Sequence, residues 1–146
     1  MNVYLAGPLF TQAERRWLRE LASRLGVAGH QVFLPQDHAE LPLLADPPDY
    51  HGAFEACRDA VDRCDAVVAV LDGADADSGT AWECGYAYAR SKPIVALRTD
   101  FRGGEDQGLN LMLRRSASAI VERSATDESL DALASELARQ LEKLTG

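Results

Sequence analysis

The feature that most constrains the fold is an alternation of short apolar, β-branched runs with longer segments of helical periodicity. The clearest run is AVVAVL at residues 66–71, whose unbroken apolar character is typical of a strand covered on both faces. Helical patterns flank this run at about residues 50–63 and 80–91. Strands and helices in strict alternation predict a parallel sheet, and a doubly covered strand belongs at its centre.

The same alternation extends along the whole chain of 146 residues, which we expect to form one domain (residues 1–146). Right-handed crossovers then favour an α/β, flavodoxin-like (Rossmann-like) three-layer sandwich with a parallel sheet in the order 2-1-3-4-5. We expect loops at the Pro-rich residues 35–48 and at residues 98–115, a segment long enough to act as a lid or an interface. The remaining strands are expected at residues 3–7, 30–34, 93–97 and 117–121, and the remaining helices at about 11–25 and 127–144.

The charge of the chain limits its partners. It carries 15 Lys and Arg against 23 Asp and Glu, a net charge of −8, and its basic residues are scattered. This balance disfavours polymeric nucleic acid and leaves a small neutral ligand, or a phosphate met by one or two arginines. No apolar run approaches the roughly 18 residues of a membrane span, and no leader is recognisable. We therefore expect a soluble, cytoplasmic protein without membrane contact.

The three cysteines predict neither disulfides nor a metal site. They form no CxxC pair and lie at no metal-ligand spacing from a histidine. Cys57 and Cys64 are seven residues apart on one face of the same predicted helix, and core packing is the expected role of both. No metal or other cofactor is predicted.

The predicted topology places a ligand site at the carboxyl ends of the first and third strands, where the strand order reverses. The loops expected there are residues 7–11 and 72–80. Gly7 and Phe10 of the first loop are therefore candidate substrate contacts. The second loop carries three aspartates and leads to Glu83, so four carboxylates are expected at the mouth of the site: Asp72, Asp75, Asp77 and Glu83.

Two interpretations of Glu83 are open on local grounds. One is a capping box, with Thr80 as the N-cap and Glu83 returning a hydrogen bond to it. The other is a functional carboxylate in the first turn of a helix, where the macrodipole favours the ionised form. Tyr4, on the first predicted strand, is either an ordinary core residue or a hydroxyl partner for Glu83.

Four segments carry a resemblance to a known family. VYLAGPLF, CRDAVDRCDAVVAVLDG, DSGTAWECGYA and GLNLML occur in this order between residues 3 and about 113. Together they resemble the nucleoside 2-deoxyribosyltransferase family. The resemblance implies that Glu83 is a nucleophile forming a covalent deoxyribosyl intermediate and that Tyr4 orients it. It also implies that Asp59 and Asp77 occupy the family's acidic positions near base and sugar.

The resemblance further implies an assembly. Asn110 and Met112 match residues that the family supplies to the neighbouring subunit's site, so a homodimer or higher homo-oligomer with shared sites is expected. The implied reaction moves the 2-deoxyribosyl group of a deoxynucleoside to a free nucleobase, with hydrolysis when no acceptor base is present. A retaining transfer of this kind needs one group to attack and one acid to protonate the leaving base. Asp59 is the first candidate for that acid and Asp77 the second.

Two alternatives stay open. A 2'-deoxynucleoside 5'-monophosphate N-hydrolase must also hold a phosphate, and the first loop, GPLFT, offers few donors for one, although Arg98 and Arg102 lie elsewhere in the chain. A non-catalytic nucleoside or nucleotide sensor would share most of the site. A phosphorylated receiver module is disfavoured, because the first strand ends without the acidic residues that would hold magnesium.

Overall fold

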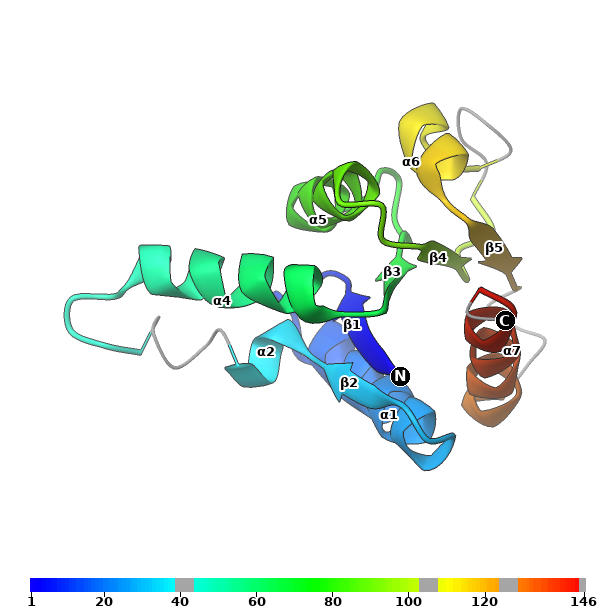
Figure 1. The fold of residues 1–146 in the computed structure, drawn as a ribbon, viewed down its shortest axis with the longest axis horizontal. Helices are drawn as coiled ribbons and strands as arrows, with labels where there is room; N and C mark the ends of the chain where they lie inside the picture. Colours follow the sequence, from blue (N-terminus) through cyan, green and yellow to red (C-terminus); the bar gives the residue numbers. More distant parts are fainter. Residues whose placement is uncertain (39–43, 103–107, 124–128, 145–146) are drawn as a thin grey trace.

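The computed structural model describes residues 1–38, 44–102, 108–123 and 129–144, and these form a three-layer α/β sandwich (Figure 1). A five-stranded parallel sheet runs in the order β2-β1-β3-β4-β5, which confirms the predicted flavodoxin-like topology. The central strand β3 is buried at every position, as its unbroken apolar sequence predicts. The strands are β1 (Asn2–Ala6), β2 (Gln31–Phe33), β3 (Ala66–Val70), β4 (Ile94–Arg98) and β5 (Ala119–Glu122).

Helices cover both faces of the sheet and create two separate hydrophobic cores. Successive side chains of a strand point to opposite faces, so Val3 and Leu5 of β1 pack under one layer while Tyr4 and Ala6 pack under the other. The first layer consists of α1 (Gln12–Val27) and α7 (Leu130–Lys143), and the second consists of α4 (Tyr50–Arg63), α5 (Ser78–Ala89) and α6 (Leu111–Ser116). Tyr4 therefore faces the α4 and α5 side of the sheet.

Two predicted loops contain short helices. The Pro-rich segment begins with α2 (Pro35–His38), whose first residue is a proline, a residue that suits the first helical turn. Within residues 98–115, α6 starts after Asn110, whose side chain accepts hydrogen bonds from the backbone nitrogens of Met112 and Leu113. Parts of both segments, residues 39–43 and 103–107, lie outside the described residues.

The helix that carries Glu83 begins earlier than predicted. It starts at Ser78 because the carboxylate of Asp77 accepts hydrogen bonds from the backbone nitrogen of Thr80, at 2.9 Å, and from its hydroxyl, at 3.2 Å. Asp77 is thus the N-cap, and Thr80 is a buried residue inside the helix. Of the two interpretations of Glu83, the capping box with Thr80 is therefore wrong, and the expected position in the first turn is also wrong, because Glu83 lies in the second helical turn. No helix among the described residues is long and apolar enough to cross a membrane.

Candidate active site

A cavity of about 490 Å³ opens where β1, β2 and β3 end. Its walls come from the loop after β1 and from α1, α2, α4 and α5, so it lies at the switch point that the topology predicts. Most of the lining is apolar, and Glu83 is the one acidic residue among the described residues that line it. The lining residues are Leu9, Arg15, Pro35, Gln36, Ala53, Phe54, Cys57, Gly79, Trp82 and Glu83.

Glu83 is the carboxylate of this cavity, and Tyr4 lies behind it in the core. The hydroxyl of Tyr4 donates a hydrogen bond of 2.5 Å to Oε1 of Glu83, although the two residues are 79 positions apart. The Tyr4 side chain is fully buried beneath α4 and α5, so its direction is fixed by the core around it. Of the two interpretations of Tyr4, the structure supports the hydroxyl partner.

The electrostatics of Glu83 differ from the sequence-based expectation. Burial raises the pKa of Glu83 to about 7, the nearby charge of Asp77 acts in the same direction, and the hydrogen bond from Tyr4 opposes both. The expected macrodipole effect, which would favour the charged form, does not dominate because Glu83 lies beyond the first turn. Near neutral pH, Glu83 therefore exchanges readily between its protonated and ionised forms.

Two further groups surround the carboxylate. Burial and the neighbouring Glu83 raise the pKa of Tyr4, so its hydroxyl keeps its proton and acts as a donor. Burial also raises the pKa of Cys57, whose thiol interacts with Tyr4 and lines the cavity. The prediction that both helical cysteines serve core packing holds for Cys64, which is buried at the end of α4, but is incomplete for Cys57.

The other predicted acidic residues do not line the cavity. Asp59 lies on α4 with its side chain 43% exposed, and its Oδ1 accepts from Nε of Arg58 at 2.9 Å and from Nη2 at 2.6 Å. Asp77 caps α5 and acts on Glu83 through its charge. Asp72 instead binds the backbone and hydroxyl of Thr99, at the end of β4. The expected gathering of four carboxylates at one mouth is therefore wrong.

The first loop contributes Leu9 to the cavity wall in place of the predicted Phe10. Phe10 is 75% exposed and does not line the cavity, whereas Leu9 does. Gly7 is buried at the end of β1, where an added Cβ would lie 3.0 Å from the Leu18 side chain and 3.2 Å from that of Val70. Gly7 thus permits close contact between β1, β3 and α1, a structural role that differs from the predicted substrate contact.

Asn110 and Met112 lie in a different groove. This groove runs between α5 and α6 and is lined by residues that include Tyr88, Asn110 and Met112. Met112 is 75% exposed and Tyr88 64% exposed. Neither Asn110 nor Met112 lines the cavity of its own chain.

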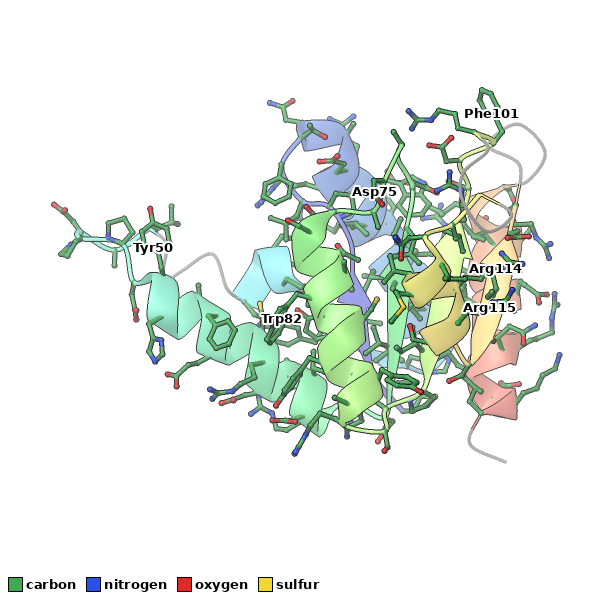
Figure 2. All side chains as sticks on the ribbon, turned by 90° about the horizontal axis from the view of Figure 1, so that it is seen from above. Tyr50, Asp75, Trp82, Phe101, Arg114 and Arg115 are labelled. Carbon is green, nitrogen blue, oxygen red and sulfur yellow. The ribbon has the colours of Figure 1, made fainter. Side chains whose placement is uncertain are left out.

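The residues that the sequence analysis missed are the aromatic groups of the cavity wall. Phe54 of α4 and Trp82 of α5 meet edge to face with ring centroids 5.3 Å apart, and Figure 2 shows Trp82 between these helices. Gln36 of α2 is buried beside the cavity. The helical spacing of Ala53, Cys57 and Val61 was a usable signal for the inner face of α4, because residues four apart share one face.

Among the described residues, no group of three or more His, Cys, Asp or Glu side chains is arranged to hold a metal ion.

The fold and the cavity together define a class of protein. It is a flavodoxin-like α/β protein with a carboxylate that is hydrogen-bonded to a buried tyrosine, in a cavity at the carboxyl ends of its strands. Residues 3–113 match the family model of nucleoside 2-deoxyribosyltransferases, and the chain belongs to this family.

The chain is also similar to individual proteins. The chain is 34% identical over 108 residues to an uncharacterized protein of Schizosaccharomyces pombe; the match covers 68% of the chain and about half, 51%, of that relative. A conserved protein of Enterococcus faecalis V583 superposes with a TM-score of 0.77 at 28% identity, covering 96% of this chain and 98% of the other. A 2-deoxyribosyltransferase from Bacillus psychrosaccharolyticus has the same fold, with a TM-score of 0.71, 24% identity and coverages of 92% and 90%.

Proposed function

We propose that this protein transfers the 2-deoxyribosyl group of a deoxynucleoside to a free nucleobase through a covalent intermediate on Glu83, and hydrolyses the nucleoside when no acceptor base is present. The observation that carries the proposal is the Tyr4–Glu83 pair, a carboxylate held by a buried hydroxyl inside a largely apolar cavity. Membership of the deoxyribosyltransferase family supports this choice of reaction.

The reaction follows from two displacements at the same carbon. Tyr4 holds Oε1 of Glu83, which leaves Oε2 to attack the anomeric carbon. The bond from that carbon to the base nitrogen breaks, its electron pair stays on the base, and the base takes up a proton. An acceptor base, or water, then attacks the same carbon from the other side, loses a proton and releases the Glu83 carboxylate. Two inversions give net retention at the sugar.

The environment of Glu83 suits this role. With a pKa of about 7, a substantial fraction of Glu83 is ionised at neutral pH. A carboxylate that has lost most of its water shell attacks without first shedding solvent, and its charge acts strongly on the positive charge that develops on the sugar. Tyr4 fixes the direction of attack because its own side chain is immobilised in the core.

The leaving base needs a proton, and the two candidate donors, Asp59 and Asp77, lie outside the cavity lining. Asp77 is the better placed of the two candidates, because it lies near Glu83, at the start of the same helix. Asp59 points to Arg58, and it would need a rotated side chain to contact a base in the cavity. We therefore propose Asp77 as the first candidate and Asp59 as the second.

We also propose that the groove between α5 and α6 forms a contact between subunits. Tyr88 and Met112, which line this groove, are large apolar side chains exposed to water in a single chain, and a neighbouring subunit would cover them. A homo-oligomer built on this groove would bring Asn110 and Met112 toward a neighbouring chain. Completion of each site by its neighbour is part of this proposal.

A nucleotide N-hydrolase is the second candidate, because one arginine, Arg15, lines the cavity. The arginines considered from the sequence are used elsewhere. Arg98 is buried and donates to the carbonyl oxygens of Leu71 and Arg102, and the Arg102 guanidinium binds Asp100. Comparing each deoxynucleoside with its 5'-monophosphate distinguishes the two functions.

The test is an incubation with deoxyadenosine, deoxyinosine, thymidine and deoxycytidine, each with and without an acceptor base. Chromatography should show release of the first base and, when an acceptor is present, formation of a new deoxynucleoside. Mass spectrometry of a quenched reaction should find one deoxyribosyl group on the peptide that contains Glu83. The proposal fails if no base is released from any substrate, or if the Glu83→Ala variant retains near-normal activity.

A further inference from the structure

We propose that Phe33 and His38 are positioning residues of the active site. Their rings form stacks that hold the ring of Tyr4, and with it the hydroxyl that binds Glu83. Neither Phe33 nor His38 is among the described residues that line the catalytic cavity, so both act through Tyr4 and not by touching a substrate. This inference rests on the proposed function and adds two residues to its machinery.

The starting observation is a pair of ring stacks that meet at Phe33. The register between β1 and β2 pairs Tyr4 with Phe33, and both side chains pack on the α4 and α5 side of the sheet. Their rings stack with centroids 5.4 Å apart and planes 14° apart. The ring of His38 stacks on that of Phe33, with a centroid distance of 4.5 Å and an angle of 19°. Phe33 thus links the active-site tyrosine to a residue of α2.

The orientation of the Tyr4 ring decides how well its hydroxyl donates to Glu83. The hydroxyl oxygen is the side-chain atom farthest from the backbone, so a small tilt of the ring moves it away from the carboxylate. The O–H bond of a phenol also prefers the plane of its ring, so the ring plane sets the direction of the hydrogen bond. A ring stacked nearly parallel to Tyr4 restricts both movements. Misplacement of an active-site group by even 1 Å is costly to a reaction.

The place of Phe33 in the sheet explains the role of His38. In the described part of the chain β2 is the outermost strand, so no further strand supports the ring of Phe33. His38 supports it from α2, the short helix that follows β2 (Figure 1). His38 is exposed, and it lines a groove with Phe33 that is separate from the catalytic cavity. Substitutions at exposed positions usually change folding little, so His38 can be varied in an intact protein.

The first experiment needs no substrate. NMR of protein with isotope-labelled glutamate follows the titration of the Glu83 carboxyl, whose signal is assigned by its loss in Glu83→Gln. The hydrogen bond from Tyr4 is the interaction that lowers the pKa of Glu83, so weakening this bond must raise the titration midpoint. We expect Phe33→Leu and His38→Ala each to raise the midpoint by about 0.3 to 1 pH unit.

Two controls accompany this titration. His38→Phe keeps a flat ring and loses the ring nitrogens, and it should leave the midpoint where it is in the unmodified protein. Val32→Ala removes packing from the opposite face of β2, next to Phe33 in the sequence, and should also leave it unchanged. The other ionisable groups beside Glu83 are the same in every variant: Asp77, Cys57, Cys84 and, in the cavity wall, Arg15.

The second experiment measures base release. Phe33→Leu should lower kcat by about 3- to 30-fold and His38→Ala by about 2- to 5-fold, with KM for the nucleoside changed by less than about 2-fold, because neither ring contacts the substrate. In a Tyr4→Phe background no hydroxyl remains to be directed, so each substitution should cost less than about 1.5-fold more. If Phe33→Leu does not fold, the exposed His38→Ala gives both readings alone.

Each outcome decides between the possibilities. A Glu83 midpoint that does not move in these variants overturns the inference. So does a His38→Phe protein that behaves like His38→Ala, because His38 would then act through its nitrogens. Losses of kcat that persist in full in the Tyr4→Phe background would mean that the rings only support the fold, which also overturns it. If the midpoint moves as expected but the unmodified protein releases no base, the proposed function fails and the hold of the rings on Tyr4 stands.

Discussion

Replacing Glu83 with glutamine should make the protein more stable at alkaline pH, and the gain should disappear in acid. The folded state raises the pKa of Glu83 from 4.5 to about 7, chiefly through burial. Between these two values the folded state holds the proton that the unfolded state has lost, so the free energy of unfolding falls as pH rises through this window. Glutamine is neutral at every pH and avoids this loss.

The magnitude follows from the size of the shift. A rise from 4.5 to about 7 corresponds to roughly 3 kcal/mol at pH values well above 7. The glutamine amide brings hydrogens that the apolar cavity does not pair, which offsets part of the gain, and we expect a net stabilisation of about 1 to 3 kcal/mol at pH 8.5. For a domain of this size, this corresponds to roughly 2 to 10 °C in Tm. At pH 4 the gain from linkage is absent and only the cost of the unpaired amide remains, so Glu83→Gln should be as stable as the original protein or up to about 2 kcal/mol less stable.

The assay is urea unfolding followed by circular dichroism at pH 4, 6, 7 and 8.5, with the free energy of unfolding extrapolated to water. Glu55→Gln is the matched control, because Glu55 is about half exposed on α4 and its ion pairs with His51 and Arg58 are long, at 3.5 Å. Its effect should stay within a few tenths of a kcal/mol at each pH. A Glu83→Gln protein that is less stable than the original at pH 8.5, or whose gain is independent of pH, would refute the reasoning.

Three further predictions concern activity. The kcat/KM for base release should rise with pH through about 7 as Glu83 ionises, and a rate that is flat from pH 5 to 8 would contradict its role as nucleophile. Tyr4→Phe should lower kcat/KM by about 10- to 100-fold at pH 7 and move this rise to higher pH, because the lost hydrogen bond is the one that lowers the Glu83 pKa. Mixing Glu83→Ala with Asn110→Ala protomers should restore activity if sites are shared; co-expressed hetero-oligomers without activity would mean that Asn110 does not act across an interface.

The sheet could be predicted because its signal is local. Residues 66–71 are apolar without interruption, and the flanking helical patterns leave few alternatives for the order of the strands. Helix boundaries near the site were harder. Asp77 and Thr80 are both good N-cap residues three positions apart, and only the burial of Thr80 in the folded chain decides between them.

Which side chains line the cavity depends on the rotation of each helix about its axis and on contacts between residues that are distant in the sequence. Asp59 and Cys57 are two positions apart on α4, which turns their side chains by about 200° relative to each other, so one lines the cavity and the other contacts Arg58. The pairing of Tyr4 with Glu83 joins β1 to α5 and was suggested by the family resemblance. The hydrogen bond from Gln36 to a backbone oxygen of α1 could not be predicted, because the two residues are 21 positions apart.

The burial that makes Glu83 costly to the fold is also what makes it useful for the proposed reaction. A solvated carboxylate would have a pKa near 4.5, would be ionised at neutral pH and would be shielded by water from the charge that develops on the sugar. In this cavity the carboxylate is harder to ionise, yet once ionised it acts across an apolar space in which Tyr4 already fixes one oxygen. Stability and reactivity at this position therefore oppose each other, and a substitution that relieves the buried charge must also remove the attacking group.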